Sequence, residues 1–165
     1  MQEPGPRPIS RIIFRTVFFD QAIQAAVGLE PSAAFFKDLL CAMGGSHQAV
    51  CTQVVLLGSG MDTRPWRLKL PPGIAWFEVD QAEVLNAKQQ LLGREGVAFT
   101  ADGPMDQLRF PLRCSKWAGV PLDLQCMGWT DKLKASGFKT DMLTIWVLEV
   151  RIISRGHRFR KAGHA

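Results

Sequence analysis

The sequence predicts an α/β fold in which a parallel β-sheet is built from strands that alternate with helices. Four short apolar runs have the composition of buried strands, and segments with helical spacing of apolar residues lie before or between them. The 165 residues are 47% hydrophobic and 21% charged, which suits one globular domain and excludes a disordered or coiled-coil chain. No apolar run approaches the length of a membrane span.

The first fifty residues are predicted to be helical after an irregular start. Three prolines within residues 1–10 predict an irregular lead-in. Apolar residues recur at near-helical spacing over 11–28, which predicts a first helix. A second helix is expected over 32–43, because Ser32 is a suitable N-cap after a proline and the glycine pair at 44–45 would end the helix.

The rest of the chain is predicted to form the sheet. The expected strands are 53–58, 74–80, 118–124 and 142–149. Pro121 places the third strand at an edge of the sheet, because proline cannot donate a hydrogen bond to a neighbouring strand. Helices are expected over 81–92, ending at a glycine, and over 131–136, while 93–117 should be a loop with one short helix.

The positive charge of the chain is concentrated in its last fifteen residues. The net charge is +5, and residues 151–165 contain five basic and no acidic side chains, so that residues 1–150 sum to zero. We therefore divide the chain into a domain, 1–150, and a basic irregular tail, 151–165. A basic face running through the fold, which would favour nucleic-acid binding, is not indicated.

The cysteines and the amino terminus indicate a cytoplasmic protein without a membrane partner. The four cysteines contain no CxxC pair, and no apolar signal core follows the amino terminus. Free thiols in a reducing compartment are therefore expected. The three histidines share no ligand spacing with the cysteines, so no metal site is predicted.

The segment with the clearest chemical meaning is the glycine-rich turn that follows the first predicted strand. Gly58 and Gly60 lack a Cβ, so a ligand can approach the backbone closely. Asp80 lies twenty residues beyond Gly60, at the end of the next strand, where an acid can accept hydrogen bonds from both ribose hydroxyls. This spacing favours a nucleoside-bearing cofactor, although an ordinary turn with a chance acid remains the alternative.

The residues after this turn argue against a dinucleotide. Thr63 stands where the dinucleotide fingerprint requires a third glycine, and Asp62 would place a negative charge near a pyrophosphate. S-adenosylmethionine (SAM) has no phosphate and carries a sulfonium cation, so acids near the turn are acceptable. No Gly-Lys-Ser/Thr sequence follows the turn, which excludes a Walker motif.

Several segments together resemble the leucine carboxyl methyltransferase family of SAM-dependent O-methyltransferases. The quoted segments are Val-Leu-Leu-Gly-Ser-Gly-Met-Asp-Thr-Arg at 55–64, Phe-Glu-Val-Asp at 77–80, Arg-Thr-Val-Phe-Phe-Asp at 15–20, Val-Pro-Leu-Asp-Leu at 120–124 and Trp-Val-Leu-Glu at 146–149. The resemblance covers residues 11–149. It implies the Rossmann-like sheet of class I SAM methyltransferases, here with its amino-terminal strands in the order 3-2-1-4.

The resemblance also implies roles for seven cofactor-binding residues. They are Arg15, Gly58, Gly60, Asp80, Asp123, Leu124 and Glu149. The two glycines would let the methionine part pass over the turn, and Asp80 would bind the ribose. Asp123 and Leu124 would contact the adenine. Arg15 would pair with the cofactor carboxylate, and Glu149 would lie near the methionyl end. No catalytic residue is assigned.

The family pattern stops after Glu149, where the family continues as Gly-Leu-Leu-Met-Tyr and this chain reads Val-Arg-Ile-Ile-Ser. We therefore expect a form that is truncated after the fourth strand. In it, strand four becomes an open edge through which the chain can self-associate.

The function expected from these observations is SAM-dependent methyl transfer, O- or carboxyl-directed, to an unidentified small molecule or protein carboxylate. One alternative is an inactive truncated form that serves as an interaction module. A nucleic-acid binder acting through the basic tail is a less favoured alternative.

Four polar side chains near the turn have interpretations without a ligand. Glu78 is expected to face solvent, because side chains alternate along a strand. Arg64 and Arg67 are predicted to be surface or helix-packing residues. Asp62 suits a helix cap as well as a functional role.

Overall fold

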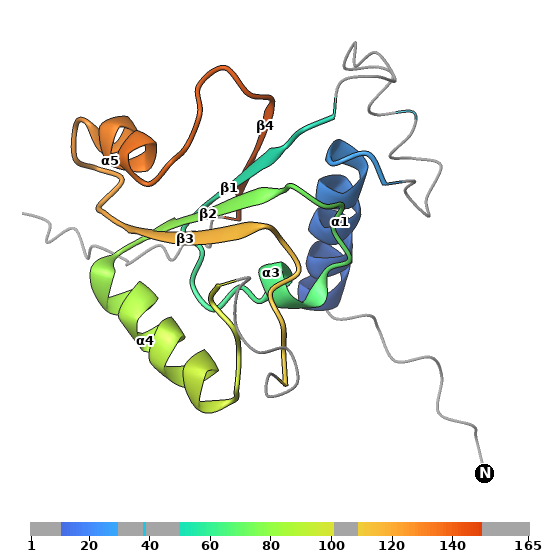
Figure 1. Cartoon of the computed structure of the whole chain (residues 1–165), viewed down its shortest axis with the longest axis horizontal. Coiled ribbons are helices and arrows are strands. Elements are labelled where there is room, and N and C mark those ends of the chain that lie inside the picture. Colours follow the sequence, from blue (N-terminus) through green and yellow to red (C-terminus); the bar gives the residue numbers. More distant parts are fainter. Residues whose placement is uncertain (1–10, 30–37, 39–49, 101–108, 150–165) are drawn as a thin grey trace, which may run out of the picture.

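The computed structural model describes residues 11–29, 38, 50–100 and 109–149 (Figure 1). Its elements in chain order are α1 Arg11–Ala26, β1 Gln53–Leu57, α3 Arg64–Arg67, β2 Ala75–Asp80, α4 Ala82–Arg94, β3 Lys116–Pro121, α5 Trp129–Ala135 and β4 Thr144–Leu148. The expected lead-in 1–10, the tail 151–165 and, apart from residue 38, the expected helix 32–43 lie outside the described residues.

The four strands form one parallel sheet in the order β3-β2-β1-β4, which confirms the predicted class and strand order. Val55 of β1 is in register with Phe77 of β2 on one side and with Trp146 of β4 on the other. Pro121 is the last residue of β3, an edge strand of the described sheet, as its missing N–H predicts.

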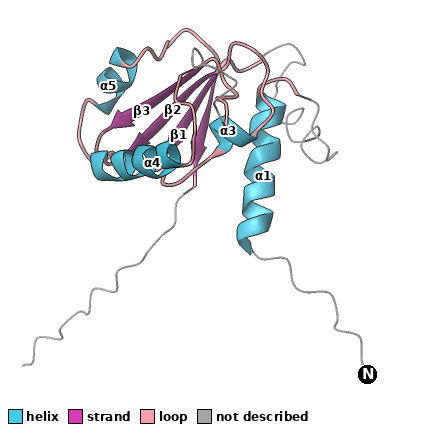
Figure 2. Ribbon diagram, turned by 60° about the horizontal axis from the view of Figure 1, so that its bottom comes forward, coloured by secondary structure: helices cyan, strands magenta, loops and turns pink. Residues whose placement is uncertain are grey.

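Helices cover both faces of the sheet (Figures 1 and 2). One face packs against α1, α3 and α4, and the other packs against α5. Successive residues of β1 alternate between the two sides, since Val54 and Leu56 belong to one buried cluster and Val55 to the other. The first cluster includes Ile23 of α1 and Trp66 of α3, and the second includes Leu133 of α5.

Some element boundaries differ from the predicted ones. The helix α4 continues through Gly93 to Arg94, and α5 begins at Trp129, two residues earlier than expected. The helix expected after the glycine turn is the four-residue α3, whose bounds the sequence did not predict, because a single turn is too short to show helical periodicity. The strands β3 and β4 are shorter than their apolar segments, and both begin and end within two to three residues of the predicted limits.

The strand β4 is the other edge of the described sheet. Val147 is buried, whereas Trp146 and Leu148 on the opposite side are about half exposed (47% and 54%). Self-association through this edge stays a prediction. None of the helices in the described part of the chain is long and apolar enough to cross a membrane.

Glu78 corrects one expectation, because it is fully buried rather than solvent-facing. It lies in β2, an interior strand of a parallel sheet with helices on both faces, so neither of its faces reaches solvent. The fully buried ammonium of Lys88 on α4 pairs with the Glu78 carboxylate and lies 5.6 Å from the ring centroid of Trp66. Burial raises the pKa of Glu78, and the nearby charge of Lys88 only partly offsets this.

We predict that Lys88→Met lowers the free energy of unfolding by about 3–5 kcal/mol, because it leaves a buried carboxylate without its partner. The double change Lys88→Met with Glu78→Leu should recover most of that loss. Urea unfolding of each variant measures the effect. The exposed Lys132→Met is the control, and a Lys88→Met cost no larger than the control's would show that the pair does not matter.

Candidate functional site

The turn after β1 has a backbone that requires glycine. Gly58 and Gly60 have φ angles of +68° and +49°, in the left-handed region that side chains rarely adopt. A Cβ added at either position would meet no atom within 4 Å. The space beside the turn is therefore open, so a ligand can lie directly against the backbone.

Asp80, at the end of β2, holds this turn in place. Its Oδ2 accepts a hydrogen bond from the backbone N–H of Gly60 at 2.7 Å, and its Oδ1 accepts one from Gln81 N–H at 2.8 Å. The N–H of Gly58 donates to the carbonyl of Val79 at 2.8 Å. Each carboxylate oxygen of Asp80 keeps a further lone pair for a ligand hydroxyl.

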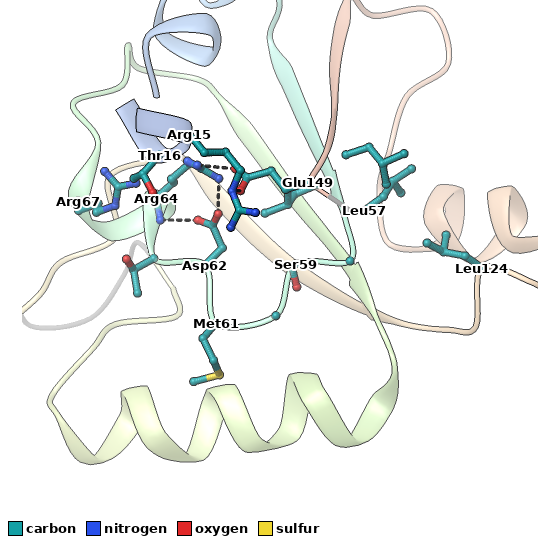
Figure 3. A pocket seen from close by; sticks show the side chains of 15 residues that line it. Arg15, Thr16, Leu57, Ser59, Met61, Asp62, Arg64, Arg67, Leu124 and Glu149 are labelled. Atoms are coloured by element: carbon teal, nitrogen blue, oxygen red, sulfur yellow. Dashed lines mark hydrogen bonds and ion pairs between the residues drawn. The ribbon is translucent and has the colours of Figure 1, made fainter. Parts of the chain in front are cut away.

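A pocket of about 780 Å³ opens at the carboxyl ends of β1 and β4 (Figure 3). Residues 15–16, 56–64, 67, 124 and 148–149 line it. The strand order reverses here, since β2 and β3 lie on one side of β1 and β4 lies on the other. Open α/β sheets bind their ligands at such a reversal, outside the carboxyl ends of the strands.

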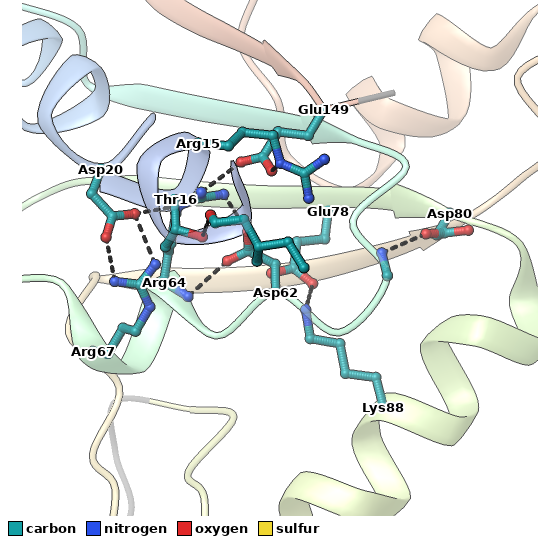
Figure 4. Close-up of polar contacts among 12 residues, drawn as sticks. Arg15, Thr16, Asp20, Asp62, Arg64, Arg67, Glu78, Asp80, Lys88 and Glu149 are labelled. Atoms are coloured by element: carbon teal, nitrogen blue, oxygen red, sulfur yellow. Dashed lines mark hydrogen bonds and ion pairs between the residues drawn. The ribbon is translucent and has the colours of Figure 1, made fainter. Parts of the chain in front are cut away.

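A buried arginine forms the back of the pocket. Arg64, the first residue of α3, is only 2% exposed and contacts three carboxylates (Figure 4). Its Nε lies 2.6 Å from Asp20 Oδ1, its Nη2 lies 2.5 Å from Glu149 Oε1, and its Nη1 pairs with Asp62 Oδ2. Helix α1, the glycine turn and the end of β4 are thus joined through one guanidinium.

Two further arginines complete this charge cluster. Arg67 binds Asp20 with both terminal nitrogens, at 2.5 and 2.8 Å, and Arg15 Nε lies 3.4 Å from Glu149 Oε2. We use the name charge cluster for Arg15, Asp20, Asp62, Arg64, Arg67 and Glu149. Three positive and three negative side chains make it neutral, which lowers the cost of burying it.

The ion pairs shift the pKa of two members. Burial alone would raise the pKa of Asp20, but hydrogen bonds and charges from Arg67 and Arg64 outweigh burial and hold it below its ordinary value. Burial opposes the charge of Arg64, but the Asp62 charge and the Asp20 hydrogen bond outweigh it and raise the Arg64 pKa. Both side chains are therefore ionised at neutral pH.

Three buried polar atoms on the pocket wall have no hydrogen-bond partner among the described residues. They are Arg15 Nε, Ser59 Oγ and Glu149 Oε1. The charges of Arg15 and Glu149 are paired at the distances given above, without the alignment of a hydrogen bond. Such atoms favour a ligand that brings its own donors and acceptors, because a buried polar group without a hydrogen bond is costly.

The pocket gathers most of the residues that the family resemblance assigns to a cofactor. Arg15, Gly58, Gly60, Leu124 and Glu149 line it, and Asp80 lies directly behind Gly60. Asp123 is exposed and does not line the pocket; its Oδ1 accepts a hydrogen bond from Gln125 N–H at 2.9 Å. The roles of these residues stay predictions.

The sequence reasoning missed the centre of the charge cluster. A surface or packing role suits Arg67, whose side chain is 39% exposed, but Arg64 is a buried charge and not a surface residue. Asp62 is not the N-cap of α3, which is Thr63, but its Oδ1 accepts a hydrogen bond from Arg64 N–H, in the first turn of that helix, at 2.7 Å. The sequence offered one indication of the contact between Asp20 and Arg64, because both lie in segments that resemble the family, 15–20 and 55–64.

The cluster does not resemble a metal centre. The described residues contain no group of three or more histidine, cysteine or acidic side chains that could hold a metal ion. Each carboxylate of the cluster faces an arginine instead.

Comparison with known proteins supplies independent information. A family model described as leucine carboxyl methyltransferase matches residues 2–153. A relative from Mycobacterium ulcerans (strain Agy99), named "Putative S-adenosyl-L-methionine-dependent methyltransferase", is 33% identical over 147 residues, or 88% of this chain and 36% of the relative. A relative of the same name from Mycolicibacterium gilvum (strain PYR-GCK) is 31% identical over 141 residues, or 86% of this chain and 36% of the relative. The chain therefore spans about a third of the length of these curated relatives.

We predict that Asp20→Asn lowers the free energy of unfolding at pH 7. The difference in this free energy between the variant and the unchanged protein should shrink below about pH 4. The folded pKa of Asp20 lies below its ordinary value of 3.8, so its stabilisation is complete above that value and is lost as the pH falls through the folded pKa. Urea unfolding between pH 7 and pH 2 measures this.

The exposed Asp131→Asn on α5 serves as the control for Asp20→Asn, with a small effect expected at every pH. If the loss of unfolding free energy in Asp20→Asn stays constant down to pH 2, the lowered pKa of Asp20 in the folded protein is contradicted.

Proposed function

Because the chain belongs to the leucine carboxyl methyltransferase family, we propose that it binds SAM in this pocket and serves methyl transfer to an oxygen acceptor. The observation that carries the proposal is the open glycine turn at the strand reversal, with Asp80 at the end of the next strand and a charged wall opposite. Binding and transfer by this chain extend what the names of the longer relatives say of those proteins.

The residues of the pocket fit the chemical parts of SAM. The amino-acid end of the ligand is a zwitterion, and the wall offers the guanidinium of Arg15 for its carboxylate and the carboxylate of Glu149 for its ammonium group. Asp80 offers free lone pairs to ribose hydroxyls. Leu124 provides an apolar contact suited to adenine.

When bound, SAM supplies a methyl group activated by a sulfonium centre. The task of this chain is then to hold the ligand at both ends, so that little orientational freedom remains. Correct orientation of reacting groups can account for a large part of a rate enhancement. The glycine turn lets the ligand lie close to the backbone, and Arg15 and Glu149 orient its amino-acid end.

A carboxylate is the acceptor that suits this site best. A carboxylate is already ionised near pH 7 and needs no general base to become a nucleophile. The described residues that line the pocket include no histidine or lysine to act as one, and its two carboxylates, Asp62 and Glu149, are paired with Arg64. The family description, which names a leucine carboxyl group, supports the same acceptor class.

The two alternatives have less support. An interaction module would not require the family's glycine turn to face an open pocket. A nucleic-acid binder would depend on residues 151–165, which lie outside the described structure, whereas the family match covers residues 2–153.

Calorimetric titration with SAM tests the proposal. We expect saturable binding, and we expect Asp80→Ala to weaken it roughly tenfold or more, since a hydrogen bond to a charged group contributes about 1.5–3 kcal/mol. Asp131→Ala, on the exposed surface of α5, should bind as the unchanged chain does.

Thermal melting of each variant separates lost binding from lost folding. Asp80→Asn is the second variant, because its amide oxygen can still accept the Gly60 hydrogen bond while the charge is removed. A folded, soluble chain that shows no heat of binding with SAM would refute the proposed function.

A further inference from the structure

We propose that Arg64 is a positioning residue that makes the pocket selective for the amino-acid end of SAM, an inference that rests on the proposed function. The guanidinium does not contact the ligand itself. It acts by fixing the direction of Glu149 and the shape of the glycine turn.

The contacts of Arg64 leave it little capacity to bind a ligand. Its three nitrogens face three different carboxylates, those of Asp20, Asp62 and Glu149, and the residue is 2% exposed. Arg64 itself lies at the back of the pocket, but its donors face these carboxylates, so we expect its effect on a ligand to pass through them. Two of them, Asp62 and Glu149, line the pocket.

Glu149 depends on Arg64 for its orientation. It directly follows Leu148, the last residue of β4 and the last one in register with β1, so the sheet pairing does not extend to it. Its Oε1 lies 2.5 Å from Arg64 Nη2, and its Oε2 lies 3.4 Å from Arg15 Nε. The closer pair fixes the carboxylate, while the longer one leaves Arg15 able to turn to a ligand carboxylate.

Removal of Arg64 would change the positions of both Glu149 and Arg15. Arg15 would then be the remaining arginine partner of Glu149 in the described part of the chain. A closer Arg15–Glu149 pair would satisfy both side chains internally and withdraw them from a zwitterionic ligand. The nucleoside end, where Asp80 and Leu124 lie, would be affected far less.

Lysine cannot replace arginine in this position. The guanidinium is planar and presents donors in several directions, whereas an ammonium group is a compact point charge on a flexible stem. Three carboxylates that come from α1, the turn and the end of β4 need that spread of donors. Arg64→Lys therefore keeps the positive charge but should lose the positioning.

Two ligands separate this role from a purely structural one. SAM carries the amino-acid end, and 5′-deoxy-5′-methylthioadenosine is a nucleoside without it. We expect Arg64→Lys to raise the Kd for SAM tenfold or more and to change the Kd for methylthioadenosine less than twofold, measured by calorimetric titration. Asp80→Ala should weaken both ligands, because both contain the ribose.

Arg94→Lys is the matched control, since it makes the same chemical change on an exposed residue at the end of α4, outside the pocket. It should leave both Kd values unchanged. Asp20→Asn is a second test variant, because it removes one anchor of Arg64 without altering the pocket lining. The same selective loss, of smaller size, is expected from it if Arg64→Lys does not fold.

The outcomes are distinguishable. Suppose that the folded Arg64→Lys and Asp20→Asn variants lose affinity for both ligands equally, or lose affinity for neither. Either result would overturn the positioning role of Arg64, while SAM binding by the unchanged chain would stand. Failure of the unchanged chain to bind either ligand would instead refute the proposed function.

Discussion

The pocket wall depends on one buried ionic contact, the guanidinium of Arg64 among three carboxylates. Removing an arginine from water is costly unless its donors are satisfied in good geometry. Here Asp20 and Asp62 each accept a hydrogen bond from one nitrogen, and Glu149 forms an ion pair with a third. Arg67 and Arg15 balance the remaining charge. Because the three acids lie on separate elements, the contact that neutralises Arg64 also fixes α1, the glycine turn and the end of β4 relative to one another.

The sheet determines where this contact can act. Parallel strands end at the same edge, and the reversal of order beside β1 leaves room there for a ligand. The glycine turn uses that room, because its left-handed backbone and missing Cβ atoms keep the space beside it open. Asp80 then connects the turn to β2 through Gly60. The shape of the pocket follows from the sheet, and the charged groups on its wall belong to the charge cluster around Arg64.

The features that depend on local sequence pattern could be predicted. Strand composition predicted the sheet, Pro121 predicted an edge, and the turn with Asp80 predicted the edge at which the pocket lies. Contacts between segments far apart in the sequence could not be predicted. Asp20 and Arg64 are 44 residues apart, and nothing in either segment alone indicates that they meet. Glu78 was placed in solvent because alternation says which face a residue occupies, but not whether a helix covers that face.

A crystal structure of the chain with S-adenosylhomocysteine would show directly whether the Arg64 cluster shapes the ligand site. We expect the ligand to lie against Gly58 and Gly60, with its ribose at Asp80 and its amino-acid end between Arg15 and Glu149. We also expect Arg64 to keep its three carboxylate partners in that complex. A ligand bound elsewhere, or an Arg64 that leaves Glu149 to bind the ligand itself, would contradict the positioning role of Arg64.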